Sequence, residues 1–203
     1  MYENYCGFKL TQIVKPEENI LWQGKPDKRC FILECIFNPM LPFALIWFLF
    51  DAFFIFAILS SGKSFVTGST QAASSELIFM ILFFAFHLMP VWIYLFGIIF
   101  SFKKYSNTEF IVTDKAVYIS GGIFSYNCER KPIEKIATLQ IRQGFFDRML
   151  YVGDVIIERY TTGYGKRRRT VEHAIIDIPD FQNVYDLISD LQYRAQRRRT
   201  EEE

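Results

Sequence analysis

Histidine and cysteine are scarce in this sequence, and the few that occur are scattered. The 203 residues include 2 histidines and 4 cysteines. Cys30 and Cys35 do not have the CxxC spacing, and no second pair completes a zinc-binding pattern. We therefore predict that the protein holds no metal and no cofactor, and we interpret the cysteines as structural thiols.

The sequence also lacks the short motifs of common catalytic sites, such as a Gly-rich phosphate loop. The remaining candidates for acid–base chemistry are Asp147 and Asp154, with Arg148 between them. General acid–base catalysis needs groups that converge on one substrate, and nothing in the pattern indicates convergence. We favour a structural interpretation, in which Asp147 and Arg148 pair locally on a surface turn and Gly153 lets the backbone re-enter a strand. The prediction is that the protein is not an enzyme.

Long apolar runs, in contrast, fill the first half of the chain. Residues 40–59 contain one charged residue, Asp51, and residues 77–100 contain one histidine, His87. Because a helix needs about 20 predominantly apolar residues to cross a bilayer, each run predicts a transmembrane helix. Together they predict a helical hairpin within residues 31–104.

Basic residues flank this hairpin on one side. Lys25, Lys28 and Arg29 precede the first run, and Lys103 and Lys104 follow the second, whereas the loop between the runs carries a single lysine. Cytoplasmic flanks are enriched in lysine and arginine. The pattern predicts a protein integral to the plasma membrane, with both termini in the cytoplasm.

The second half of the chain has the alternating pattern of half-buried strands. Residues 105–196 contain six or seven short candidate strands, among them "TEFIVT", "AVYIS", "ATLQIRQ", "DVIIERYTT" and "VEHAIIDI". An amphipathic helix starts at Pro179 or Asp180. These segments predict a small antiparallel sheet or barrel closed by a C-terminal helix. Residues 1–30 are then an N-terminal segment, and residues 197–203 a charged tail without a fixed structure.

Several segments resemble the bacterial PH-like domain proteins, a family of small membrane proteins. "PEENILWQGKP" (16–26) is similar to the family's lead-in, and "NTEFIVTDKAVYISGGIF" (107–124) to its first two strands. Residues 133–158 resemble its central signature, represented here by Arg148, Leu150 and Gly153. The resemblance implies an α+β membrane protein, with a two-helix transmembrane hairpin followed by a cytoplasmic pleckstrin-homology-like (PH-like) module.

A cluster of basic residues, Lys166, Arg167, Arg168 and Arg169, occupies the predicted tip of a hairpin. It is either a contact for anionic lipid or a protein partner, or a solvated turn. The turn at Thr113–Lys115 holds one basic and one acidic residue, so the resemblance does not carry over phosphoinositide binding. No aromatic platform or recognition helix accompanies the basic runs, which argues against nucleic acid as a partner.

Asp51 and His87 form the second candidate site. Counted at 1.5 Å per residue, both lie roughly 13–15 Å from the outer end of their helices, so an antiparallel hairpin brings them together. Ionisable residues at this depth indicate a function. The pair either locks the two helices of one chain together or faces the helices of a partner or a second copy. Pro90 predicts a kink one turn further along.

These features predict a membrane-anchored PH-like adaptor that contacts a protein partner or anionic lipid at the cytoplasmic leaflet. The expected partners are membrane lipids and either another protein or a second copy, held through the transmembrane helices. The alternative is a subunit of a membrane transport or export assembly that uses the intramembrane pair Asp51 and His87.

Overall fold

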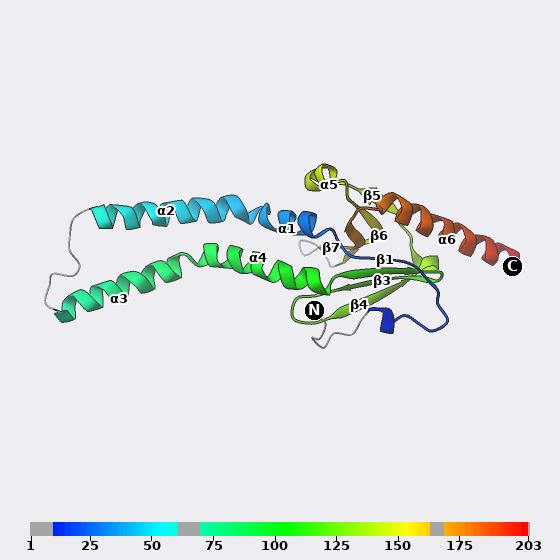
Figure 1. Cartoon of the computed structure of the whole chain (residues 1–203), viewed down its shortest axis with the longest axis horizontal. Coiled ribbons are helices and arrows are strands. Elements are labelled where there is room, and N and C mark those ends of the chain that lie inside the picture. The colour runs from blue at the N-terminus through cyan, green and yellow to red at the C-terminus, as the bar shows by residue number, and fades with distance from the viewer. Residues whose placement is uncertain (1–9, 61–69, 163–168, 203) are drawn as a thin grey trace, which may run out of the picture. The chain divides into compact units, whose positions relative to one another are not determined.

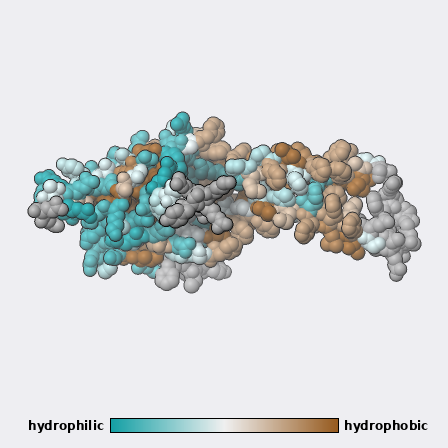
Figure 2. All heavy atoms as spheres, turned by 180° about the vertical axis from the view of Figure 1, so that it is seen from behind, coloured by the Kyte–Doolittle hydropathy of each residue, from teal (hydrophilic) through white to brown (hydrophobic). Residues whose placement is uncertain are grey.

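The chain folds into two compact units (Figure 1). The computed structural model describes residues 10–60, 70–162 and 169–202. One unit is a domain that contains the described residues up to Leu33 and those from Ser101 onward. The other is an apolar helical unit, Glu34–Phe100. Figure 2 shows that hydrophobic surface gathers over the helices of the second unit, whereas the surface of the domain is mostly hydrophilic.

The apolar unit contains one unbroken helix that is long and apolar enough to cross a membrane, Met40–Ile58. This segment lies in α2 (Met40–Ser60). The second predicted span is divided between α3 (Thr70–His87) and α4 (Met89–Asn107). Ile78–His87 and Met89–Asn107 meet at an angle of 57°, and they count as a second span only when they are taken together. The expected two-helix hairpin is therefore corrected to one straight helix followed by a bent pair.

Proline explains the bend between α3 and α4. Pro90 has no backbone N–H, so it is tolerated in the first turn of α4 but not inside a continuous helix. The break leaves carbonyl groups without helical partners, and two indole N–H groups use them. Trp92 Nε1 donates to the Ala85 carbonyl over 3.2 Å, and Trp47 Nε1 donates to the His87 carbonyl over 2.7 Å.

The domain contains two antiparallel sheets. The first has the order β1-β2-β3-β4 and the second the order β5-β6-β7. The strands are β1 (Ile20–Gly24), β2 (Glu109–Thr113), β3 (Ala116–Gly121), β4 (Asn127–Pro132), β5 (Gln140–Arg142), β6 (Gly153–Thr162) and β7 (Arg169–Ile178). In the described part of the chain, hydrogen bonds join these strands into two separate sheets, so the closed barrel considered above is not formed.

Short helices precede, follow or connect the strands, and one long helix follows β7. They are the 3-10 helices η1 (Leu10–Gln12) and η2 (Ile133–Lys135) and the α-helices α1 (Lys28–Ile36), α5 (Phe145–Leu150) and α6 (Phe181–Glu202). Apolar residues on one face of α6 recur at helical spacing, and Val184, Ile188 and Leu191 are buried. This burial explains why the amphipathic pattern forms a helix at this place.

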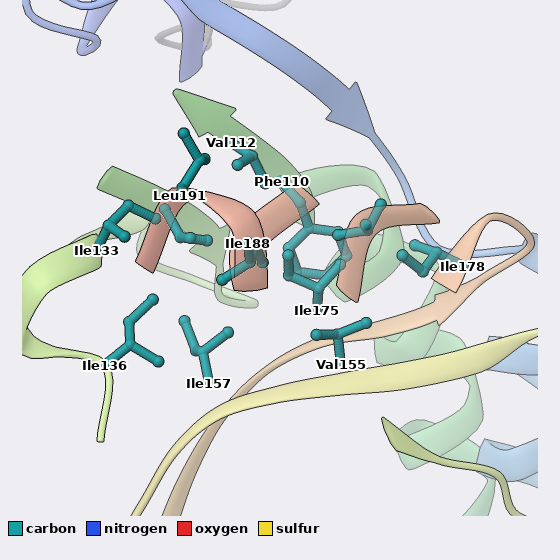
Figure 3. Close-up of a cluster of buried hydrophobic side chains, with 12 residues drawn as sticks. Phe110, Val112, Ile133, Ile136, Val155, Ile157, Ile175, Ile178, Ile188 and Leu191 are labelled. Carbon is teal, nitrogen blue, oxygen red and sulfur yellow. The ribbon is translucent and has the colours of Figure 1, made fainter. Parts of the chain in front are cut away.

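The core of the domain lies between the two sheets and α6 (Figure 3). Phe110 and Val112 of β2 face Val155 and Ile157 of β6, and Ile188 of α6 lies among them. The same cluster includes Val117, Ile133, Ile136, Ile175, Ile178, Val184 and Leu191. Because the inward residues alternate along β2 and β6, each strand contributes one face to the core.

The ends of the domain differ from the predicted division. Within the predicted N-terminal segment 1–30, β1 pairs antiparallel with β2 and forms one edge of the first sheet, so this strand belongs to the domain. The charged tail 197–203 is helical as far as Glu202. Arg197 Nε pairs with Glu201 over 3.0 Å at i,i+4 spacing, and Arg199 pairs with Glu134 of η2 over 2.9 Å. Such contacts extend the helix past the point where the apolar pattern ends.

Candidate functional site

The basic hairpin tip falls largely outside the described residues. Lys166, Arg167 and Arg168 lie in the undescribed segment, and Arg169 is described only as the first residue of β7. A role of this cluster in lipid or partner binding stays a prediction.

The signature residues Arg148, Leu150 and Gly153 belong to α5 and the start of β6. Gly144 precedes α5 in an extended conformation, and its N–H donates to Asp147 Oδ2 over 2.7 Å. This bond satisfies a backbone donor that has no partner within the helix. The helix ends at Tyr151, which has a left-handed conformation with φ 58°. Arg148 is exposed on the outer side of this turn.

Asp147 is buried, which corrects the expectation of a surface pair with Arg148. Only 1% of Asp147 is exposed. The Cys30 thiol donates to Asp147 Oδ1 over 3.1 Å. Since Asp147 also accepts from Gly144, its carboxylate joins α5 to the start of α1. Both carboxylate oxygens of Asp147 therefore have hydrogen-bond partners.

Gly153 has a packing role that differs from the predicted one. Its φ is not in the positive range, so the backbone here does not need the freedom of glycine. A Cβ at this position would lie 2.9 Å from the ring of Phe181 at the start of α6. The glycine therefore allows the close approach of α6 to the second sheet.

Asp154 is buried beside this joint and is held by two residues. Its Oδ1 accepts from the Asp177 N–H over 2.9 Å, and its Oδ2 accepts from Arg142 Nη2 over 2.8 Å. Burial raises the pKa of Asp154 above its ordinary value, and the nearby Asp147 adds to this rise, while the hydrogen bonds from Asp177 and Arg142 oppose it. Oδ1 thus contacts β7 where its pairing with β6 is irregular, and Oδ2 contacts the neighbouring strand β5.

The structure brings Asp51 and His87 together in the apolar unit. His87 Nδ1 lies 2.7 Å from Asp51 Oδ1. The imidazole stacks with the rings of Trp47 and Phe83, with centroid distances of 5.2 and 5.3 Å. Asp51 Oδ2 is buried and has no hydrogen-bond partner among the described residues. A depression of about 300 Å³ beside it is lined by Phe48, Asp51, Ala52, Ile55, Phe56 and Leu88.

A basic groove in the domain, not predicted from the sequence, lies between α6 and the turn that joins β2 to β3. It has a volume of about 530 Å³ and is lined by Asp114, Lys115, Leu191, Arg194, Arg197, Arg198 and Glu201. The cations exceed the carboxylates, and Leu191 supplies an apolar floor. The spacing of Arg194, Arg197 and Arg198 places them on one helix face, and this spacing is the signal in the sequence that identifies them.

The groove lies at the end of the domain opposite to the places where the chain leaves for the apolar unit. Lys115 is in the turn at one end of the β2–β3 hairpin. At its other end, Asn107 of α4 donates from Nδ2 to the Gly122 carbonyl over 2.9 Å. At about 3.3 Å per residue, the five residues of β2 separate these two ends by roughly 17 Å.

Two antiparallel sheets around one core, with a C-terminal helix packed on it, define a PH-like domain. The model of the family described as "Bacterial PH domain" matches residues 43–192, which is more than half of the chain. The chain belongs to the bacterial PH domain family. Searches of curated proteins and of solved structures found no match. The matched range ends before Arg194, so the arginines of the basic groove are not part of the family match.

Proposed function

We propose that the protein is a membrane-anchored, non-catalytic PH-like adaptor, and that its basic groove binds an acidic segment of a protein partner. The observation that carries this proposal is the lining of the groove, in which the cations Lys115, Arg194, Arg197 and Arg198 outnumber the carboxylates Asp114 and Glu201.

Membrane anchoring is supported by the apolar unit. Met40–Ile58 is long and apolar enough to cross a bilayer, and the bent pair α3–α4 supplies a second passage if it acts as one span. Most large apolar side chains of these helices are exposed, as lipid-facing side chains are. Lysine and arginine at Lys28, Arg29, Lys103 and Lys104 support placement of the domain and both termini in the cytoplasm.

The chemistry of the groove selects an acidic partner. Lys115, Arg194 and Arg198 supply positive charge, while Arg197 pairs with Glu201 at the rim. Arginine binds carboxylates through two parallel hydrogen bonds, which favours glutamate or aspartate side chains. Leu191 is mostly buried and offers an apolar contact between the charges. An acidic segment with an interspersed apolar residue matches this surface.

Binding of a fluorescein-labelled glutamate-rich peptide to the purified full-length protein tests the proposal. The double variant Arg194→Gln/Arg198→Gln should weaken binding by at least about tenfold, which corresponds to about 1.4 kcal/mol. Binding to the unaltered protein should also weaken as salt increases, because the contacts are solvent-accessible charge pairs.

Arg199→Gln is the matched control. Arg199 lies on the same helix and is an exposed arginine, but it pairs with Glu134 and does not line the groove. Its substitution should leave peptide binding unchanged. Equal affinity of the double variant and the control would rule out the groove as the binding site. Cross-linking in the native membrane, followed by identification of neighbours, would then name the partner.

A transport or export subunit is the second candidate function, and one observation favours it. Asp51 Oδ2 is buried beside an apolar depression without a hydrogen-bond donor among the described residues. A helix of a second copy or of another subunit can supply that donor. Disulfide cross-linking of copies that carry Phe48→Cys or Ile55→Cys tests this arrangement, since both residues line the depression. If neither variant forms cross-linked dimers, the depression is not an interface between copies.

A further inference from the structure

The three most exposed large apolar side chains among the described residues of the domain lie in the α5 turn and in the loop between β3 and β4. Phe145 and Tyr151 of the α5 turn are 79% and 84% exposed, and Met149 between them is also exposed. Phe124, in the loop between β3 and β4, is 87% exposed. Clustered apolar side chains on a soluble surface mark a contact with a protein or a membrane.

The α5 residues lie where the chain leaves the domain. The bond from Cys30 to Asp147 ties α5 to the first turns of α1. The next residue, Phe31, packs against Tyr105 near the end of α4, with 5.8 Å between the ring centroids. The exit at Leu33 and the entry at Ser101 are therefore on the same side of the domain as α5.

Phe124 is held on this side as well. Asn107, the last residue of α4, donates to the Gly122 carbonyl in the loop that presents Phe124. Gly122 has φ 124°, and a Cβ there would lie 1.9 Å from the Ser125 carbonyl oxygen. Only glycine fits this turn, so the position of Phe124 is set by the backbone.

Exposed cations surround the same side. Lys28 and Arg29 begin α1, Lys103 and Lys104 lie in the last turns of α4, and Arg148 lies between the exposed residues of α5. Aromatic and basic residues together are typical of segments that lie in the interface of an anionic membrane, where rings enter the headgroup layer and cations meet lipid phosphates.

We propose that Phe145, Met149, Tyr151 and Phe124 form a membrane-contacting edge that inserts into the headgroup–acyl boundary of an anionic leaflet. The proposal rests on the proposed membrane anchor, because the same leaflet must hold Leu33 and Ser101 close to its surface. The edge fixes the orientation of the domain, so that the basic groove at the opposite end points away from the membrane.

Photo-crosslinking to lipid tests this edge in the full-length protein. p-Benzoylphenylalanine replaces Phe145, Tyr151 or Phe124, one at a time, in vesicles of phosphatidylethanolamine and phosphatidylglycerol that contain a clickable lipid. The control position is Tyr193, which is 67% exposed on α6 next to groove residue Arg194. Lipid adducts at the three edge positions should exceed those at Tyr193 several-fold. Equal yields at all four positions would overturn the proposal.

Alkaline extraction separates this inference from the membrane anchor on which it rests. If the protein resists extraction from the vesicles but the edge positions give no lipid adducts, the anchor is supported and the edge is wrong. If alkali extracts the protein, the anchor itself is wrong.

A charged variant gives a second measurement. Phe145→Asp/Met149→Asp should lower the adduct yield at Tyr151 several-fold, because carboxylates are repelled from an anionic surface. The substituted residues are exposed, so the domain should still fold, and an unchanged thermal transition would show this. An unchanged yield at Tyr151 in the folded variant would overturn the proposal.

Discussion

The thiol of Cys30 donates a hydrogen bond to the buried carboxylate of Asp147 over 3.1 Å. The two residues are 117 positions apart in the sequence. Their contact holds α5 against α1, and it therefore positions the exposed residues of α5 at the side of the domain from which the chain leaves.

Removal of this donor should destabilise the domain. We expect Cys30→Ala to lower the free energy of unfolding by about 1–3 kcal/mol, because a buried carboxylate oxygen loses a hydrogen bond. Cys30→Ser keeps a donor of similar size and should retain most of the stability. Thermal unfolding of the full-length protein in detergent, followed by circular dichroism, measures both. If the alanine and serine variants melt at the same temperature, the hydrogen bond does not contribute.

The contact between Gly153 and Phe181 predicts a steric effect. In Gly153→Ala the new methyl group would lie 2.9 Å from the Phe181 ring, so α6 or the ring must move. We expect a loss of about 1–3 kcal/mol of stability, as for other overpacked cores. The double variant Gly153→Ala/Phe181→Leu should recover part of the lost stability.

Gly121→Ala is the matched control for this prediction. The nearest atom to its Cβ, outside its chain neighbours, would be Thr108 Oγ1 at 3.9 Å, an ordinary contact. The control should unfold close to the temperature of the unaltered protein. A Gly153→Ala variant as stable as the control would show that α6 does not require glycine at this position.

The sequence predicts the helices and strands of the domain better than it predicts the side-chain contacts between them. Short runs of apolar and alternating residues identify β2, β3 and the long pair β6 and β7, because all four strands contribute side chains to the main core cluster. β2 buries its second face as well, since Ile111 belongs to another buried cluster. The amphipathic pattern likewise identifies α6. The same pattern gives too long a strand at residues 137–143, where only Gln140–Arg142 pairs with β6.

Contacts between residues far apart in the sequence are what local patterns miss. Asp147 looks like a surface charge next to Arg148, and its burial follows from the position of Cys30. The basic groove also combines separate segments, since Lys115 and Arg194 meet only after folding. The pair of Asp51 and His87 is easier to predict, because a single acid and a single histidine in two apolar runs have few alternative partners.

Glu18 predicts a pH dependence of stability. It is buried, and Arg130 Nη2 and Thr113 Oγ1 each lie 2.7 Å from its carboxylate. Burial alone would raise the pKa of Glu18, but hydrogen bonds from Arg130, Thr113 and Tyr118 lower it below the ordinary value of 4.5. Folding lowers the pKa of this carboxyl group. The group therefore stabilises the folded state at pH values above the pKa that it has in the unfolded chain. This contribution is lost as the pH falls through the folded pKa.

The variant Glu18→Gln removes the ionised group and measures this contribution. At neutral pH it should be less stable than the unaltered protein, and the difference should shrink as the pH falls below about 4.5. Urea unfolding in detergent at a series of pH values gives the two stability curves. A constant difference across that range would contradict the assigned role of the Glu18 charge.

The pair Asp51 and His87 predicts non-additive effects of substitution. Asp51→Leu leaves the His87 imidazole without its carboxylate partner, and His87→Leu leaves the buried carboxylate without a donor. Each single change should therefore destabilise the helical unit. The double variant replaces both polar groups with apolar ones. Its loss of unfolding free energy should be smaller than the sum of the losses in the two single variants, by about 0.5–3 kcal/mol. Thermal unfolding of the four proteins in the same detergent gives this coupling energy. Strictly additive losses would show that the two side chains do not stabilise one another. The buried Asp51 Oδ2 would then be expected to contact a partner outside the chain.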